Sequence, residues 1–308
     1  MPLQDCSANK VFGTVERNLT ENEVHVWSIN VDQLAKYGGW TDLLNEEETR
    51  RAACFRFQKD RQAFIVCRGA LRILIASYLA SVPRKLRFIF SERGKPELHE
   101  SDNPGHVHFN VSHSDTRAVL AFVRNRKVGI DLERIRTDCE VEQIAGRFFS
   151  AVEKKALLSL KSRQRHKAFF NLWTRKEAFL KAKGGGLSIP LSDFDVSLEP
   201  VNPEILLATR PDANEVDRWH IESLQVAKGF AAALALEKVP EQKTHLDVRV
   251  LELPMVTRGA FAVAVDAIPP KMQIQQEPRT RASRNSASPA CGGNGPRRTT
   301  LAVVSRLA

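Results

Sequence analysis

The order of predicted helices and strands in this chain is doubled, and this doubling limits what the chain can fold into. Residues 21–125 contain one long amphipathic helix, expected over residues 60–80, followed by short strands. Apolar residues at spacings near three and four, from Phe64 to Leu79, mark the buried face of that helix. The same order of helices and then strands returns over residues 126–240. The pattern predicts an α+β (α/β) protein built from two similar halves.

Alternating apolar and polar segments place the individual elements. In the first half, strands are expected at residues 23–31, 86–90, 106–111 and 118–124. In the second half, strands are expected at residues 127–133, 193–198, 219–225 and 230–237. Ser150 and Glu153 have capping-box spacing and predict the start of a helix, and a longer helix is expected over residues 164–183, ending at glycines 184–186. Asn45 followed by Glu48 is a weaker helix-start signal.

These patterns divide the chain into an N-terminal half over residues 1–125, a C-terminal half over residues 126–240 and an extension over residues 241–308. Residues 246–253 and 259–265 of the extension have a strand-like pattern that no other signal supports. From Pro269 onward, seven basic residues stand against Glu277 alone, and Gln, Pro, Ser, Arg and Gly dominate. This composition predicts a disordered basic tail. Since the tail carries more than half of the net charge of +10, the body is mildly basic and suits an acidic protein partner or a phosphate-rich ligand.

Composition excludes several other classes of protein. An apolar share of 43% and a charged share of 27% are typical of a soluble globular protein. Apolar runs such as residues 231–236 are far shorter than the ~20 residues that span a bilayer, and the N-terminus lacks the apolar stretch of a secretory signal. We therefore expect a cytoplasmic protein with no membrane partner. Five scattered cysteines without a CxxC pair predict reduced thiols rather than a zinc site or disulfides.

The segment VGIDLE, residues 128–133, carries two carboxylates at alternate positions. On a strand, Asp131 and Glu133 point to one face, while Ile130 and Leu132 point to the core. Two carboxylates on one face repel each other unless a positive group lies between them. A hard cation such as Mg²⁺ would satisfy both and keep open positions for water and phosphate oxygens. The alternative is a solvated strand edge without a ligand.

The segment LWTRKEAFLK, residues 172–181, places Trp173, Glu177 and Lys181 on one face of the expected helix. A tryptophan can wall off a site, a glutamate can act as a third metal ligand or a base, and a lysine can hold a phosphate. The alternative is a surface Glu–Lys pair, worth ~0.3–0.5 kcal/mol, beside a core tryptophan.

Two further segments join a strand or a turn to polar residues. In FNVSHS, residues 109–114, the side chains of Asn110, Ser112 and His113 could bind an anion such as phosphate. In RGKP, residues 93–96, Lys95 lies in a rigid turn. Alternatively, His113 is an ordinary residue at a strand end and Lys95 belongs to a solvated loop.

The order and spacing of these segments resemble the 4′-phosphopantetheinyl transferases of the Sfp type. The resemblance covers about residues 50–235 and includes GKP, FNVSHS, VGIDLE, RFFSAVE, WTRKEAFLK and GGGL. It implies a pseudo-twofold monomer of two α/β halves that binds coenzyme A in the cleft between them. It also implies transfer of the 4′-phosphopantetheine arm to a serine of an acyl or peptidyl carrier protein, with release of adenosine 3′,5′-bisphosphate.

The resemblance assigns roles residue by residue. It makes Asp131, Glu133 and Glu177 the magnesium ligands, and Glu177, directly or through a water, the base for the carrier serine. It places Lys181 and Lys95 near the phosphates. The remaining assignments are contacts to the nucleotide and its phosphates by Asn110, Ser112 and His113, and a contact to the 3′-phosphate by Arg51, with Arg56, Lys59 and Arg68 as rivals.

Two other functions are compatible with parts of the sequence. The first is a nucleic-acid-binding protein that uses the basic tail, with the three carboxylates as a nuclease-type metal site. The tail has no aromatic residue for stacking on bases, which disfavours this reading, and we expect no nucleic-acid partner. The second is a non-catalytic scaffold, which the presence of all three carboxylates and both lysines disfavours.

Overall fold

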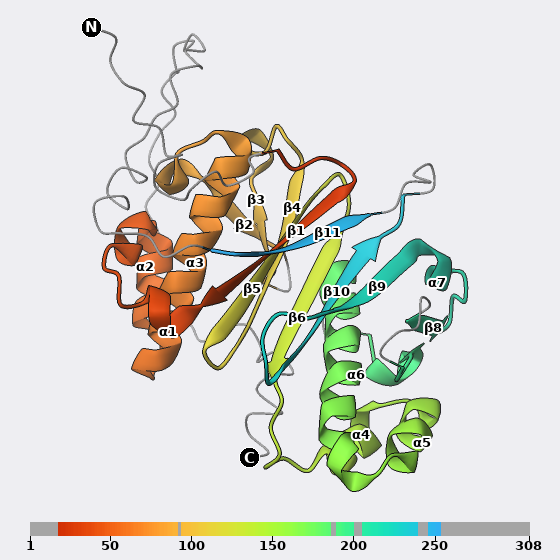
Figure 1. Cartoon of the computed structure of the whole chain (residues 1–308). Coiled ribbons are helices and arrows are strands. Elements are labelled where there is room, and N and C mark those ends of the chain that lie inside the picture. Colours follow the sequence, from red (N-terminus) through yellow and green to blue (C-terminus); the bar gives the residue numbers. More distant parts are fainter. Residues whose placement is uncertain (1–17, 92–93, 186–188, 200–204, 240–245, 254–308) are drawn as a thin grey trace, which may run out of the picture.

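The structure is a computed structural model that describes residues 18–91, 94–185, 189–199, 205–239 and 246–253. Its described part contains two larger sheets, which lie between two long helices (Figure 1). The first sheet has the strand order β11-β1-β5-β4 and the second has the order β6-β10-β9. The prediction of a mixed helix-and-sheet protein is confirmed. The predicted tail from Pro269 lies outside the described residues.

The first half supplies three strands of the first sheet and the long helix that packs on it. Its strands are β1 (Glu23–Asn30), β2 (Phe88–Phe90), β3 (Pro96–Leu98), β4 (Val107–Ser114) and β5 (Arg117–Arg124). Its helices are α1 (Val31–Leu34), α2 (Glu46–Ala53) and α3 (Gln58–Leu79). Among the described residues, α3 alone is apolar and long enough to span a membrane by composition, but it packs into the core of this half.

The second half repeats the arrangement with a second sheet and a second long helix. Its strands are β6 (Val128–Arg134), β7 (Phe194–Val196), β8 (Leu206–Thr209), β9 (Trp219–Leu224) and β10 (Phe230–Glu237). Its helices are α4 (Val141–Phe148), α5 (Ala151–Ser159), α6 (Ser162–Lys183) and α7 (Glu215–Arg218). The long helices of the two halves, α3 and α6, both match the predicted ranges to within two residues at each end.

Local sequence signals explain where these helices begin and end. Both predicted helix starts are present, and each is a capping box: the side chain of Asn45 accepts from the Glu48 N–H, and that of Ser150 accepts from the Glu153 N–H. Helix α6 ends at Gly184, whose φ of 71° is left-handed and therefore suits glycine.

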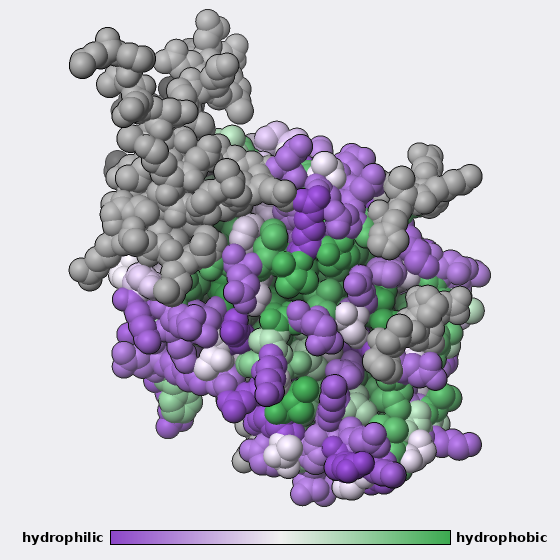
Figure 2. Space-filling view, in the orientation of Figure 1, coloured by the Kyte–Doolittle hydropathy of each residue, from purple (hydrophilic) through white to green (hydrophobic). Residues whose placement is uncertain are grey.

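Three apolar clusters lie between the layers. One lies between α3 and the first sheet, and another between α6 and the second sheet. The third joins facing sides of the two sheets and includes Val24 and Val119 from the first sheet and Ile130 and Leu132 from the second. Figure 2, which has the orientation of Figure 1, shows hydrophobic side chains gathered near the centre of this view, over the sheets. The two halves are thus held together by a shared apolar layer.

Part of the predicted extension belongs to the first sheet. Residues Asp247–Glu252 form β11, which pairs in parallel with β1 from Glu23↔Asp247 to Ser28↔Glu252. The strand-like pattern over residues 246–253 is therefore confirmed, whereas the pattern over residues 259–265 lies outside the described residues. The chain thus leaves the second half after β10 and returns to the edge of the first sheet (Figure 1).

Candidate active site

Strand β6 presents its two carboxylates toward α6, as its alternating pattern predicts. Ile130 and Leu132 are fully buried in the cluster between the sheets, so Asp131 and Glu133 point to the opposite face. Gly129, on the same face as the carboxylates, lies directly under the backbone of α6. Both carboxylates are buried, which rules out the solvated strand edge as a description of this segment.

Helix α6 brings its functional side chains to these carboxylates. The Lys181 ammonium lies 2.6 Å from Asp131 Oδ1, 2.9 Å from Ser112 Oγ and 3.2 Å from the Ile130 carbonyl oxygen. The Glu177 side chain is buried, and its charge contributes to the raised pKa of Glu133. An exposed Glu–Lys pair is therefore the wrong description of this helix face.

Trp173 does not wall off the site. Its ring stacks on Phe169 with centroids 5.7 Å apart and lies 6.3 Å from both Phe148 and Phe149. It is buried in the cluster between α6 and the second sheet, so the core-tryptophan alternative is correct for this residue. The reason is that four aromatic rings from α4, α6 and the residue after α4 fill that core together.

The groups around Asp131 and Glu133 supply too little positive charge to balance the two carboxylates. Burial and, after it, the charge of Asp131 raise the pKa of Glu133 to about 8, with a smaller contribution from Glu177 and against opposing effects of Ser114 and Lys181. One buried oxygen of each strand carboxylate, Asp131 Oδ2 and Glu133 Oε1, has no hydrogen-bond partner within the described part of the chain. Two such hard oxygen donors fit a divalent cation.

The predicted set of three magnesium ligands is not assembled by these side-chain positions. Across the residues that the structure describes, no three Asp, Glu, His or Cys side chains lie close enough together to hold one ion. Asp131 and Glu133 form a pair on β6, and the cation beside Asp131 is the Lys181 ammonium. The carboxylate oxygens of Asp131 and Glu133 therefore fit a cation, and the binding of Glu177 to the same cation stays a prediction.

Three side chains of β4 bond to the open edge of β6, and we call them the β4–β6 ladder. They come from alternate positions of FNVSHS and accept hydrogen bonds from backbone N–H groups of β6, whose other edge pairs with β10. The rungs are Asn110 Oδ1 with the Ile130 N–H (2.9 Å), Ser112 Oγ with the Leu132 N–H (3.3 Å) and Ser114 Oγ with the Arg134 N–H (3.1 Å).

The ladder changes the interpretation of FNVSHS. In this structure Asn110 and Ser112 are buried and bonded to β6, so their predicted contacts to a nucleotide would need them to exchange partners. Ser114 was not predicted as a site residue, although its place two positions after Ser112 was the signal that could have found it. His113 points to the other face of β4 and is exposed.

Lys95 also bonds to the second half. Its ammonium donates to the carbonyl oxygens of Val128 (3.2 Å) and Lys181 (2.9 Å), and burial lowers its pKa. The lysine of the GKP turn thus joins β6 to α6 from the first half. It is not a solvated loop residue, and its predicted contact to phosphate stays a prediction.

The four candidates for the 3′-phosphate differ in how they are held. The guanidinium of Arg51 lies 5.5 Å from the Phe64 ring centre and 5.6 Å from that of Phe90. Arg68 is buried, with Glu48 3.5 Å away, and its burial lowers its pKa to about 10. Arg56 lies over Phe57, 5.3 Å from its ring centre. Arg68 is therefore bound into the core, which leaves Arg51, Arg56 and Lys59 as the accessible candidates.

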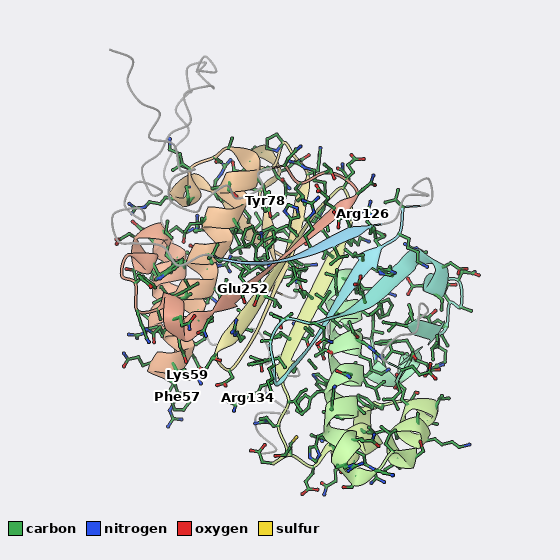
Figure 3. The ribbon with its side chains drawn as sticks, viewed as in Figure 1. Phe57, Lys59, Tyr78, Arg126, Arg134 and Glu252 are labelled. Carbon is green, nitrogen blue, oxygen red and sulfur yellow. The ribbon has the colours of Figure 1, made fainter. Side chains whose placement is uncertain are left out.

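Lys59 lies at an exposed junction of the two halves. Asp115, in the turn between β4 and β5, accepts from the Lys59 ammonium at 2.7 Å and from the Arg134 guanidinium at 2.5 Å. Lys59 comes from α3 and Arg134 from the end of β6, and Figure 3 shows both at the same end of the sheets. Two cations that meet one carboxylate leave a net positive charge at this end of the sheets.

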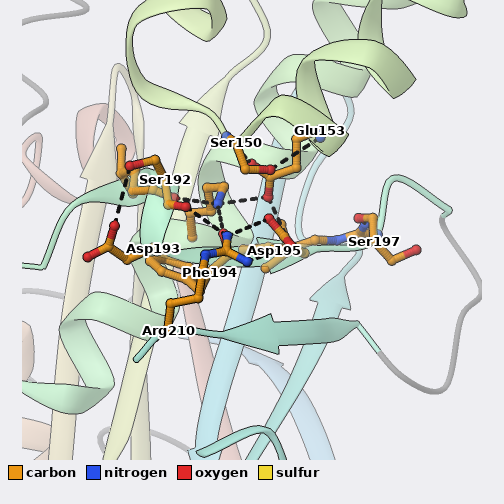
Figure 4. A network of polar contacts seen from close by, with 12 residues as sticks. Ser150, Glu153, Ser192, Asp193, Phe194, Asp195, Ser197 and Arg210 are labelled. Atoms are coloured by element: carbon orange, nitrogen blue, oxygen red, sulfur yellow. Dashed lines mark hydrogen bonds and ion pairs between the residues drawn. The ribbon is translucent and has the colours of Figure 1, made fainter. Parts of the chain in front are cut away.

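A second buried polar network, which the sequence did not predict, anchors α6. The Lys176 ammonium lies 2.7 Å from Glu153 Oε1 and donates to the carbonyl oxygens of Leu191 (2.7 Å) and Phe194 (2.5 Å). Asp195 and Arg210 form an ion pair beside it (Figure 4). Lys176 precedes Glu177 in the chain, so these contacts fix the rotation of α6 and with it the direction of Glu177.

Two family models match the chain, and they divide it where the structure does. A model described as the 4′-phosphopantetheinyl transferase superfamily matches residues 127–235, and one described as 4′-phosphopantetheinyl transferase, N-terminal, matches residues 27–124. The first match begins just before β6 and the second ends with β5. Each half of the molecule is thus similar to a separate part of the same family of enzymes.

Individual relatives are similar over most of the described chain. The 4′-phosphopantetheinyl transferase HetI of Nostoc sp. is 38% identical over 219 residues, which cover 71% of this chain and 89% of that protein. The human L-aminoadipate-semialdehyde dehydrogenase-phosphopantetheinyl transferase is 30% identical over 233 residues, which cover 71% of this chain and 75% of that protein. The 4′-phosphopantetheinyl transferase Sfp of Bacillus subtilis is 35% identical over 151 residues, which cover 48% of this chain and 65% of that protein.

Proposed function

The chain belongs to the 4′-phosphopantetheinyl transferase superfamily and is a transferase, and on this premise we propose its reaction in detail. It transfers the 4′-phosphopantetheine group of coenzyme A to a serine of an acyl or peptidyl carrier protein, depends on Mg²⁺ and releases adenosine 3′,5′-bisphosphate. The observation that supports this proposal is the meeting of two half-satisfied carboxylates on β6 with Lys181 of α6. That meeting puts anionic and cationic groups together in one buried place.

The chemical problem is electrostatic. The bond that breaks joins the two phosphates of coenzyme A, the attacking serine hydroxyl is a weak nucleophile, and the leaving group is a phosphate anion. Asp131 and Glu133, with Glu177 as the third ligand, would hold a magnesium ion, which supplies positive charge beside the phosphates when bound. Lys181 adds a second positive charge at the same place, where burial strengthens its effect.

Glu177 acts on the proton of the reaction. The serine oxygen forms a bond to the phosphorus that carries the pantetheine arm, and the bond to the bridging oxygen breaks. Glu177 takes the serine proton, directly or through a water, which raises the nucleophilicity of the oxygen. Helix α6 presents both Glu177 and Lys181 on the side that faces β6, so one rigid element positions the base and the phosphate-binding cation.

The partners follow from charge. Coenzyme A is rich in phosphate, and the exposed cluster of Lys59, Arg134 and Asp115 carries a net positive charge at the junction of the halves. We propose that the carrier protein is acidic and that the transferase acts as a cytoplasmic monomer. Encounter between oppositely charged proteins should then slow as salt rises.

The direct test is incubation of the full-length chain with coenzyme A, Mg²⁺ and an apo carrier protein. The expected result is a mass gain on the carrier equal to the phosphopantetheine group, and its absence over a range of carriers would contradict the proposed reaction. Asp131→Ala and Glu177→Ala should each remove most of the activity and keep the circular dichroism of the folded chain. Lys181→Ala should lower turnover or coenzyme A affinity ~10-fold or more, since it removes a charge-assisted contact of ~1.5–3 kcal/mol.

A matched control separates these site effects from the loss of any acidic residue. Glu222 is a half-exposed glutamate on β9 of the same sheet, and its neighbour is His220 at 3.5 Å. Glu222→Ala should transfer at the wild-type rate. Near-normal transfer by Asp131→Ala or Glu177→Ala at saturating Mg²⁺ would overturn the assignment of these carboxylates.

A further inference from the structure

The two serines of the β4–β6 ladder contact more than the backbone of β6. The Ser112 hydroxyl donates to Asp131 Oδ1 at 2.9 Å, and the Ser114 hydroxyl donates to Glu133 Oε2 at 2.9 Å. A hydroxyl has one proton to donate and two lone pairs that accept. Each serine therefore commits its single proton to the carboxylate that lies next to its rung.

The contacts around Ser112 leave its hydroxyl only one orientation. Its lone pairs accept from the Leu132 N–H at 3.3 Å and from the Lys181 ammonium at 2.9 Å, and its proton goes to Asp131. All three of its hydrogen-bonding positions are thus in use. Ser114 repeats two of these contacts one rung further along β6, with the Arg134 N–H and Glu133.

These bonds sort the oxygens of the carboxylates into two kinds. One oxygen of each is held by a serine, namely Asp131 Oδ1 and Glu133 Oε2. The other oxygen of each is buried and has no hydrogen-bond partner among the described residues. The serines thereby decide which oxygen of each carboxylate is left to bind a ligand, and both serines act in the same way.

We propose that Ser112 and Ser114 are positioning residues that present Asp131 Oδ2 and Glu133 Oε1 to the divalent cation. This proposal rests on the proposed function, because it takes the carboxylates as the ligands of that cation. The serines contact neither the cation nor the reacting atoms. Their effect passes through the rotamers of the two carboxylates, which are held from the first half of the molecule.

The third rung shows what a purely structural role looks like. Asn110 accepts from the Ile130 N–H at 2.9 Å and is buried like Ser112, but within the described part of the chain it makes no hydrogen bond to a carboxylate of β6. It secures the register of β6 against β4 without fixing either ligand. Loss of the Asn110 side chain should therefore cost stability without changing the affinity for the cation.

The experiment measures Mn²⁺ binding by calorimetry to the full-length chain with saturating coenzyme A and no carrier protein, so that no transfer takes place. Ser114→Ala should weaken Mn²⁺ binding about 10- to 100-fold, as loss of an outer-shell partner of a metal ligand usually does. Ser114→Thr keeps the hydroxyl and should restore the affinity to within about threefold. Asn110→Ala should lower the melting temperature and, at a coenzyme A concentration that saturates this variant, bind Mn²⁺ like the wild type.

Several outcomes would overturn the proposal. Wild-type Mn²⁺ affinity in Ser114→Ala would reduce the serine to a structural rung, and so would equal losses of affinity in Ser114→Ala and Asn110→Ala. Absence of Mn²⁺ binding by the wild type would also refute it. Should Ser114→Ala fail to fold, the near-isosteric Ser114→Cys, a weaker donor, replaces it with the same expected direction.

Failure of the proposed function would look different. A wild-type chain that transfers nothing to carrier proteins, but loses Mn²⁺ affinity on Ser114→Ala, would retain the positioning role and lose the reaction. Ser223→Ala is the matched control, because this serine on β9 accepts from Arg175 at 3.0 Å and, among the described residues, makes no hydrogen bond to a carboxylate of β6. It should bind Mn²⁺ and transfer like the wild type.

Discussion

The closeness of β6 and α6 can be tested at one glycine. Gly129 lies on the face of β6 that carries Asp131 and Glu133, and α6 passes directly over it. A Cβ added at this position would lie 2.9 Å from the Ala182 Cα and closer still to the Ala178 carbonyl oxygen and the Ala182 nitrogen. We predict that Gly129→Ala separates the carboxylates from Glu177 and Lys181.

The size of the effect follows from these contacts. Carbon atoms in ordinary contact lie about 3.5–4.0 Å apart, so α6 must retreat by roughly 1 Å or more. All three neighbours are backbone atoms, and no side chain can rotate away to make room. Overpacking of this kind costs about 1–3 kcal/mol of stability, and a misplacement of about 1 Å at a catalytic site can cost ~100-fold in rate.

The assay is phosphopantetheine transfer to an apo carrier, followed by mass, together with urea denaturation. Gly129→Ala should fold, lose stability in the stated range and transfer ~100-fold more slowly. Gly146→Ala is the matched control, since no heavy atom lies within 4 Å of its added Cβ, and helix α4 should gain up to about 1 kcal/mol. Wild-type rate and stability in Gly129→Ala would show that the strand and helix need not lie this close.

Three further predictions concern charge and the tail. Lys176→Met leaves the buried Glu153 carboxylate without its cation, so urea denaturation should show that the free energy of unfolding falls by about 3–5 kcal/mol. Glu153→Gln in the same chain should restore part of this loss. A loss below about 1 kcal/mol would contradict the buried ion pair. Because the pKa of Glu133 is raised to about 8 in the folded protein, the folded chain binds a proton between pH 6 and 8 that the unfolded chain has released. The free energy of unfolding of the metal-free protein should therefore rise on the order of 2 kcal/mol as the pH falls from 8 to 6. That stability is lost as the pH rises through about 8, Glu133→Gln should flatten the dependence, and a flat wild-type profile would contradict the raised pKa. Deletion of residues 269–308 should leave the transfer rate unchanged, whereas a tail-dependent rate would favour a nucleic-acid or other role for the basic segment.

Features that depend on neighbouring residues in the chain were predictable. The helix starts at Asn45 and Ser150 are confirmed because the residues that signal each start lie within one helical turn. The shared face of Asp131 and Glu133 is confirmed because side chains alternate along any strand. Resemblance to a family supplied what local rules could not, namely that the carboxylates of residues 128–133 and the helix that carries Glu177 and Lys181 belong to one site.

Features that depend on which elements meet were beyond local rules. Trp173 shares a helix face with Glu177 by spacing, but the aromatic core of the second half holds it. Asn110 and Ser112 have side chains suited to an anion, yet the open edge of β6 needs acceptors and takes them first. The parallel partner of β1 could not be found from the pattern of residues 246–253, because a parallel pair has no connecting turn to signal it.

The position of β11 affects how the molecule is made. A ribosome delivers β1 among the first strands, whereas its parallel neighbour β11 emerges only after the whole second half has been synthesised. During that interval one edge of β1 exposes unpaired backbone groups, and such an edge can template pairing with another nascent chain. The first sheet therefore cannot be complete until the whole second half and β11 have been synthesised.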